Sequence, residues 1–163
     1  MKRGTLVQDM AMDVAEHWRI FLDDAFEREL YRDGLRFPGY ELLENRESDG
    51  EIIRRIRVVP RLDLPGPVEK LLGKSFAYTE EGSFDRKAQV WRSKFIPSVL
   101  VDRLTSTVVV RAEPAGEGRC RRTVDYAVEA RIFGVGGMVE SALEKSVRGG
   151  WEAGARFMNG WKR

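Results

Sequence analysis

The change in hydrophobic period close to residue 134 is the feature that most constrains how this chain can fold. Between residues 37 and 132 apolar and polar side chains alternate as in strands, whereas from about Gly137 to Trp161 apolar residues recur at helical spacing. A sheet of that size exposes a large apolar patch unless something covers it, and the terminal helix is the only predicted element long enough. We therefore expect an α+β fold in which a curved antiparallel sheet wraps around a long C-terminal helix.

The order of the remaining elements completes this prediction. Strands are expected over residues 5–12, 40–47, 51–59, 75–84, 88–96, 103–113 and 119–132. Asp13, followed by Glu16, is typical of a capped helix start, so a helix with one break is expected up to Gly34. Because the chain has no internal repeat and no long linker, residues 1–163 are expected to form a single domain.

Charge and composition argue against several classes of function. The chain has 28 basic and 26 acidic residues, and the signs are interspersed except in a short cluster of Arg119, Arg121 and Arg122, which argues against nucleic-acid binding. Cys120 is the only cysteine and no metal-ligand spacing occurs, so no intramolecular disulfide, metal or other cofactor is expected. There is neither an apolar signal segment nor a run of about 18 apolar residues, so a cytoplasmic location is expected.

The order of the elements resembles the START-like superfamily, also called the helix-grip or SRPBCC superfamily, over nearly the whole chain. The central segment is similar to the PRELI lipid-transfer family in its proline-rich loop and the strand with Tyr78 and Glu80; it reads RRIRVVPRLDLPGPVEKLLGKSFAYTEEGSFD. The segments ERELYR and FGVGGMVESALEK are similar to uncharacterised bacterial START-like proteins. The resemblance implies a hydrophobic cavity between sheet and helix, with a lipid as its ligand. Nothing in the chain resembles a targeting segment, so the mitochondrial location and helical partner of the PRELI family are not expected here.

Two charged residues are expected on the inner face of the sheet. Strand alternation places Arg54 beside Ile52 and Ile56, and Glu80 beside Tyr78. A charge on a cavity wall is costly unless it is paired or meets a charged ligand. Arg54 could therefore bind an acidic group while Glu80 holds it in place. Alternatively, the two residues pair only with each other, or a bulge turns both outward.

Aromatic and small residues complete the predicted lining. The candidate ligand-binding residues are Arg54, Tyr78, Glu80, Trp91, Tyr126, Trp151, Gly154 and Met158. Glycine inside a helix costs about 0.5–1 kcal/mol relative to alanine, so Gly150 and Gly154 need a spatial reason. That reason is either a close contact between helix and sheet or room left for a ligand.

The proline-broken segment at residues 60–74 is expected to be a long loop with a helical turn. It contains four leucines, Leu62, Leu64, Leu71 and Leu72. These leucines either plug one end of the sheet or form a lid that touches membranes transiently, with Arg61, Lys70 and Lys74 meeting anionic headgroups.

Three functions remain open at this point. We favour non-enzymatic binding or transfer of a hydrophobic ligand, with a lipid as first choice. The alternatives are a cyclase-, aromatase- or hydrolase-like enzyme that uses Glu80, Tyr78 and Tyr126 around a carbonyl, and an interaction module without a cavity. His17, the only histidine, is expected on the surface, which argues against a Ser–His–Asp enzyme. A cavity above about 300 Å³ would favour the first two functions, and a solid core the third.

Overall fold

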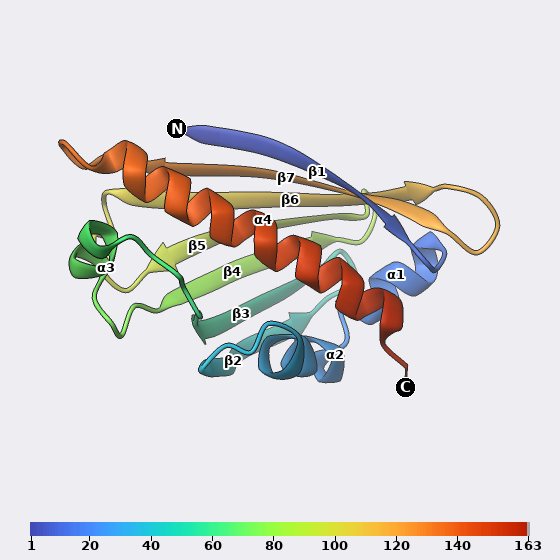
Figure 1. Cartoon of the computed structure of the whole chain (residues 1–163). Coiled ribbons are helices and arrows are strands. Elements are labelled where there is room, and N and C mark those ends of the chain that lie inside the picture. The colour runs from blue at the N-terminus through green and yellow to red at the C-terminus, as the bar shows by residue number, and fades with distance from the viewer. Residues whose placement is uncertain (163) are drawn as a thin grey trace.

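The seven strands of the computed structural model, which describes residues 1–162, form one antiparallel sheet in the order β1-β7-β6-β5-β4-β3-β2 (Figure 1). The strands are β1 (Lys2–Met10), β2 (Gly39–Glu47), β3 (Glu51–Val59), β4 (Tyr78–Asp85), β5 (Val90–Pro97), β6 (Leu104–Pro114) and β7 (Cys120–Ala130). The first strand of the chain therefore pairs with the last. The connection from β1 to β2 joins opposite edges of the sheet, and the connections from β2 to β7 join neighbouring strands.

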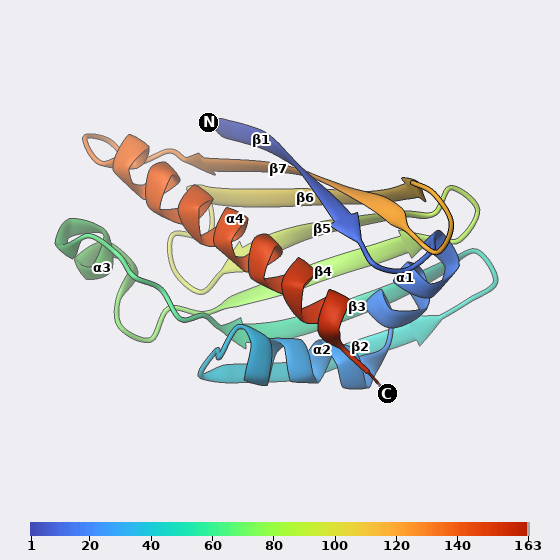
Figure 2. The same cartoon turned by 45° about the vertical axis from the view of Figure 1, so that its right-hand side comes forward.

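The helices occupy one side of this sheet. They are α1 (Val14–Phe21), α2 (Asp24–Glu29), the π-helical turn η1 (Leu30–Gly34), α3 (Gly66–Leu72) and α4 (Gly136–Gly160). Helix α4 runs diagonally across the concave face of the sheet, and both views in Figures 1 and 2 show it in front of the strands. The predicted α+β helix-grip architecture is thus confirmed.

The N-terminal helical segment is broken once, because it contains two capped starts. The Asp13 carboxylate accepts a hydrogen bond from the Glu16 backbone N–H at 2.8 Å, which begins α1. The Asp23 carboxylate accepts one from the Phe26 N–H at 3.0 Å, which begins α2. Each cap satisfies a backbone donor that a helix start leaves free. Helix α2 and η1 lie beside β2 and below the C-terminal end of α4 (Figure 2).

Strand alternation decides which side chains face α4. On β3, buried residues occupy every second position, and Arg54 lies among them as expected. On β7 the buried positions are Cys120, Arg122, Val124, Tyr126, Val128 and Ala130. Arg122 is therefore buried and does not belong to the exposed basic cluster that the sequence suggested. Its two neighbours in that cluster, Arg119 and Arg121, are exposed.

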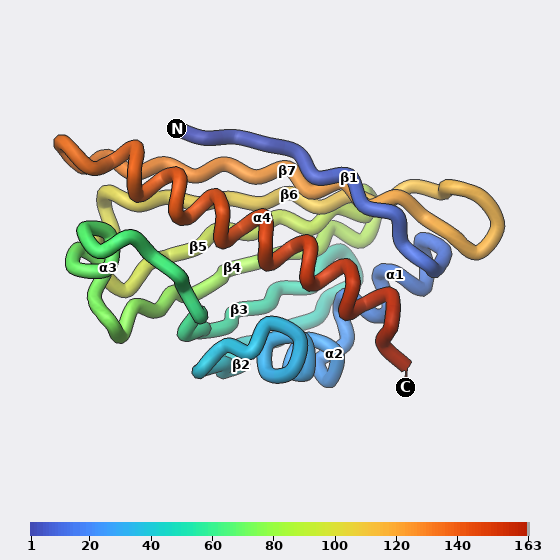
Figure 3. The backbone as a smooth tube through the Cα atoms, in the orientation of Figure 1, coloured from blue at the N-terminus to red at the C-terminus, as the bar shows by residue number. Residues whose placement is uncertain are grey.

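The core has two parts. The larger packs the inner face of the sheet against α1, α2 and α4. The smaller surrounds α3, where Val68 and Leu72 are buried and Leu62, Leu64 and Leu71 pack partly buried against them. The tube in Figure 3 shows α3 beside the first turns of α4. The loop around α3 therefore closes one end of the space between sheet and helix.

Candidate functional site

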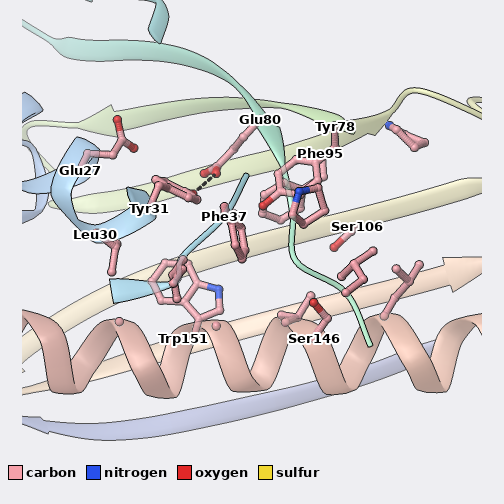
Figure 4. A pocket seen from close by; sticks show the side chains of 18 of the residues that line it. Glu27, Leu30, Tyr31, Phe37, Tyr78, Glu80, Phe95, Ser106, Ser146 and Trp151 are labelled. Atoms are coloured by element: carbon pink, nitrogen blue, oxygen red, sulfur yellow. Dashed lines mark hydrogen bonds between the residues drawn. The ribbon is translucent and has the colours of Figure 1, made fainter. Parts of the chain in front are cut away.

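A cavity of about 170 Å³ lies between α4 and the sheet. Its lining is mainly apolar and includes Phe37, Leu62, Phe95, Leu143, Trp151 and Met158. Figure 4 shows Trp151 and Ser146 reaching in from α4, with Tyr78 and Phe95 opposite them on the sheet. The volume is below the 300 Å³ expected for a drug-sized ligand, yet the core is not solid. The space suits a compact ligand.

Two glycines leave the helix side of the cavity without side chains. A Cβ atom built on Gly150 would have no heavy atom within 4 Å, and one on Gly154 would meet only Leu30 Cδ1, at 3.9 Å. Both residues border the cavity. A close approach of helix to sheet is therefore not the reason for these glycines. Their effect is to widen the cavity.

A buried ion pair lies at one wall of the cavity. Arg54 Nη2 is 2.9 Å from Glu27 Oε1, and both side chains are more than nine-tenths buried. The Tyr40 hydroxyl donates to the second oxygen of Glu27 at 2.9 Å. The Arg54 guanidinium also lies over the Trp91 ring, 4.9 Å from its centroid. The partner of Arg54 is thus Glu27 rather than Glu80, so the proposed Arg54–Glu80 pair is corrected.

Glu80 forms a second polar group together with two tyrosines. The Tyr31 hydroxyl donates a hydrogen bond to Glu80 Oε2 at 3.3 Å, as Figure 4 shows. Burial raises the pKa of Glu80 to about 7, with a further rise from Glu27 and an opposing effect of Arg54. Burial also raises the pKa of Tyr31 and of Tyr78, and the nearby charge of Glu80 adds to both shifts. At neutral pH this wall therefore combines phenol donors with a carboxyl that can be protonated.

Sequence reasoning found Arg54 and Glu80 but missed Glu27 and Tyr31. Both missed residues belong to the α2–η1 segment, whose place against the sheet has no signal in local periodicity. A buried arginine on β3 does require a carboxylate partner. Many acidic residues could have supplied one, so this requirement did not identify Glu27.

The structure brings together seven of the residues predicted for the site and leaves five elsewhere. Those that border the cavity are Arg54, Leu62, Tyr78, Glu80, Trp151, Gly154 and Met158. Those outside its lining are Leu64, Leu71, Leu72, Trp91 and Tyr126. Trp91 lies behind Arg54 and packs over Gly82. The Tyr126 hydroxyl donates to Glu144 at 2.8 Å and accepts from Arg148 at 2.9 Å, so it bonds α4 instead of facing the cavity.

The prediction that His17 lies on the surface is wrong. Its side chain is fully buried, edge-on to Trp18 and stacked near Phe21. Burial, and then the positive charge of Arg122, lowers the pKa of His17 to about 3, so the imidazole is neutral at physiological pH. Neither ring nitrogen has a hydrogen-bond partner within residues 1–162. A Ser–His–Asp arrangement is therefore not assembled around it.

Among the described residues, no group of three or more histidine, cysteine, aspartate or glutamate side chains is placed to hold a metal ion. No helix in the same part of the chain has the length and apolar character needed to cross a membrane.

The fold is similar to solved structures of diverse activity. Norcoclaurine synthase from Thalictrum flavum, in complex with dopamine and hydroxybenzaldehyde, shares 15% identity at a TM-score of 0.66, covering 99% of this chain and 88% of the other. The ZhuI aromatase/cyclase from a Streptomyces species shares 16% identity at a TM-score of 0.63, over 98% and 92%. A START superfamily protein from Mycobacterium smegmatis shares 16% identity at a TM-score of 0.60, over 97% and 94%.

Sequence comparison places the chain in one family. The search of curated protein sequences found no match. The resemblance of the central segment to the PRELI family stays a prediction. Residues 5–161 match the model of a family described as "Protein of unknown function (DUF2505)". The chain therefore has the START-like helix-grip fold and belongs to the DUF2505 family.

Proposed function

We propose that the protein binds a compact, mainly hydrophobic molecule in the cavity between α4 and the sheet, without chemically changing it. The observation that carries the proposal is the apolar cavity with a helix wall left bare at Gly150 and Gly154. A filled core would have been more stable, because each lost packing contact and each helical glycine costs free energy. A cavity kept at that cost is consistent with a bound ligand.

Lipids remain the favoured class, with a limit set by size. A cavity of about 170 Å³ accommodates a ring system or part of a single acyl chain rather than a whole phospholipid. Leu62 borders both the cavity and the cluster around α3, so the loop at residues 60–74 is the proposed route for exchange. Opening it would expose the partly buried leucines, which is where we expect transient contact with a membrane surface.

A matched pair of helix variants tests the binding proposal. Gly150→Leu places a side chain into the cavity, whereas Gly149→Leu places the same side chain on the exposed face of α4. Both changes raise helix propensity by about 1 kcal/mol, so neither should lower the melting temperature. The neutral fluorescent probe N-phenyl-1-naphthylamine should bind wild type and Gly149→Leu, and at least about tenfold more weakly to Gly150→Leu.

Two results would contradict the proposal. One is the absence of saturable binding of this probe to the wild-type protein. The other is equal affinity of wild type and Gly150→Leu, which would mean that the probe binds elsewhere on the surface.

One observation favours a second function, acid–base catalysis in the same cavity. Glu80 has a pKa of about 7 and lies beside the Tyr31 hydroxyl, which is a suitable arrangement for protonating and deprotonating a carbonyl compound. Tyr126, which the sequence analysis included in this role, is hydrogen-bonded to α4 instead. Mass spectrometry of a bound ligand recovered after incubation would distinguish the functions, because a binder returns the ligand unchanged.

A further inference from the structure

Arg122 is a buried cation next to the cavity that belongs neither to the Arg54–Glu27 pair nor to the Glu80–Tyr31 pair. Its charge acts on the neutral His17. It lies on the inner face of β7 and is only 1% exposed, and its side chain borders the cavity. Its neighbour Arg121 points to the outer face and is exposed. The cavity lining therefore contains two arginines, Arg54 and Arg122, in different electrostatic situations.

The protein supplies no counter-charge for Arg122. Its Nε donates to Gln8 Oε1 at 2.8 Å, and its guanidinium lies 5.2 Å from the centroid of the Trp151 ring. Its Nη2 is buried without a hydrogen-bond partner, and no carboxylate within residues 1–162 is at ion-pair distance. Arg54, in contrast, is paired with Glu27.

An unpaired buried guanidinium is unfavourable, because burial removes the water around the charge and no carboxylate replaces it. Deprotonation of Arg122 does not remove this cost. Burial lowers its pKa only to about 10, so it stays charged at neutral pH. Arg122 is therefore a charged group of the cavity lining that no carboxylate within residues 1–162 neutralises.

The Arg122 side chain is also held in a fixed orientation. Gln8 accepts from Arg122 Nε, and its own amide nitrogen donates to the Trp151 backbone carbonyl at 3.0 Å. Gln8 thus links β1, β7 and α4, and the guanidinium is restrained at its Nε edge. An orientation fixed before binding lowers the entropic cost of meeting a ligand.

We propose that the ligand of this cavity carries a carboxylate, which pairs with the Arg122 guanidinium and neutralises its charge. This inference rests on the proposed binding function and specifies the class of ligand. A phosphate would bring up to two charges and need more donors, whereas the lining offers one unpaired guanidinium. The ligand class is therefore a compact hydrophobic carboxylic acid, with its ring or chain in the apolar part of the cavity.

Two probes of the same shape test this assignment. Isothermal titration calorimetry at about pH 7.5 would compare 2-naphthoate with neutral 2-naphthamide, since a charge-assisted hydrogen bond is stronger than a neutral one. Wild type should bind the carboxylate at least about tenfold more tightly than the amide. Arg122→Met keeps an apolar stem and removes the charge, so it should erase the preference for the carboxylate over the amide. Arg121→Met, on the outer face, should retain the preference.

Each outcome decides between the two proposals. Equal binding of both probes to wild type would overturn the carboxylate assignment and leave the binding function standing. The carboxylate assignment is also overturned if Arg122→Met, shown by circular dichroism to be folded, still binds 2-naphthoate more tightly than 2-naphthamide. If neither naphthalene probe nor the neutral probe of the preceding test binds wild type, the binding function itself fails. If Arg122→Met does not fold, Arg122→Lys is the second variant, because it keeps the charge. Arg122→Lys should still bind 2-naphthoate more tightly than 2-naphthamide, and equal binding of the two probes would overturn the assignment.

Discussion

Replacing Glu80 with glutamine should make the protein more stable at alkaline pH. The pKa of the Glu80 carboxyl is raised from 4.5 to about 7, mainly by burial. One pKa unit corresponds to 1.36 kcal/mol between the two protonation states. Ionising Glu80 in the folded protein therefore costs up to about 3 kcal/mol more than ionising it in the unfolded chain.

The pH window follows from the direction of the shift. Between about pH 4.5 and about pH 7 the folded state holds a proton on Glu80 that the unfolded chain has released, so the free energy of unfolding falls as pH rises. This decrease in the free energy of unfolding is complete above the pKa of Glu80 in the folded protein and absent below its pKa in the unfolded chain. The amide of Glu80→Gln does not titrate, yet its oxygen can still accept the hydrogen bond from Tyr31.

Urea unfolding at several pH values from about 4 to about 8 would measure this effect. The difference in unfolding free energy between Glu80→Gln and wild type should increase in favour of the variant by up to about 3 kcal/mol across that range. The titration of His17, which is present in both proteins, largely cancels in the difference. Glu81→Gln, on the outer face of β4, removes the same charge and serves as the control. A difference that stays flat with pH, or one equally large for Glu81→Gln, would refute the reasoning.

Two further predictions concern the support of the site. Arg54→Ala leaves the Glu27 carboxylate buried without its partner and should lower the free energy of unfolding by about 3–5 kcal/mol at pH 8, less at pH 5 where Glu27 can be protonated. Equal losses in urea unfolding at both pH values would contradict this account. Gly82→Ala places a Cβ 2.0 Å from Trp91 Cζ2 and should destabilise the protein by about 1–3 kcal/mol in thermal unfolding. Gly50→Ala, which meets no atom within 4 Å, is the control, and equal losses would show that the contact is unimportant.

Local sequence patterns were sufficient for the architecture and for the faces of its elements. The alternation on β3 placed Arg54 inside, and the helical period after residue 134 predicted α4, because each pattern reports how one element meets the core. The aspartate at position 13 likewise marked the start of α1, since a cap acts on its own first turn. Alternation on β7 also places Arg122 on the inner face, although its exposed basic neighbours suggested that it was exposed to solvent.

Tertiary structure alone decided which groups meet. Glu27 became the partner of Arg54 because the fold brings α2 within ion-pair distance of β3, a contact between distant segments that neither local pattern specifies. His17 is buried because α1 packs against the sheet, although Glu16 and Arg19 on the same helix are charged. The sequence showed that Gly150 interrupts the helix face, whereas only the separation of α4 from the sheet showed that the missing side chain leaves a cavity. The hydrophobic period of a segment identifies the face on which a residue lies. The packing of elements distant in sequence determines what that face contacts.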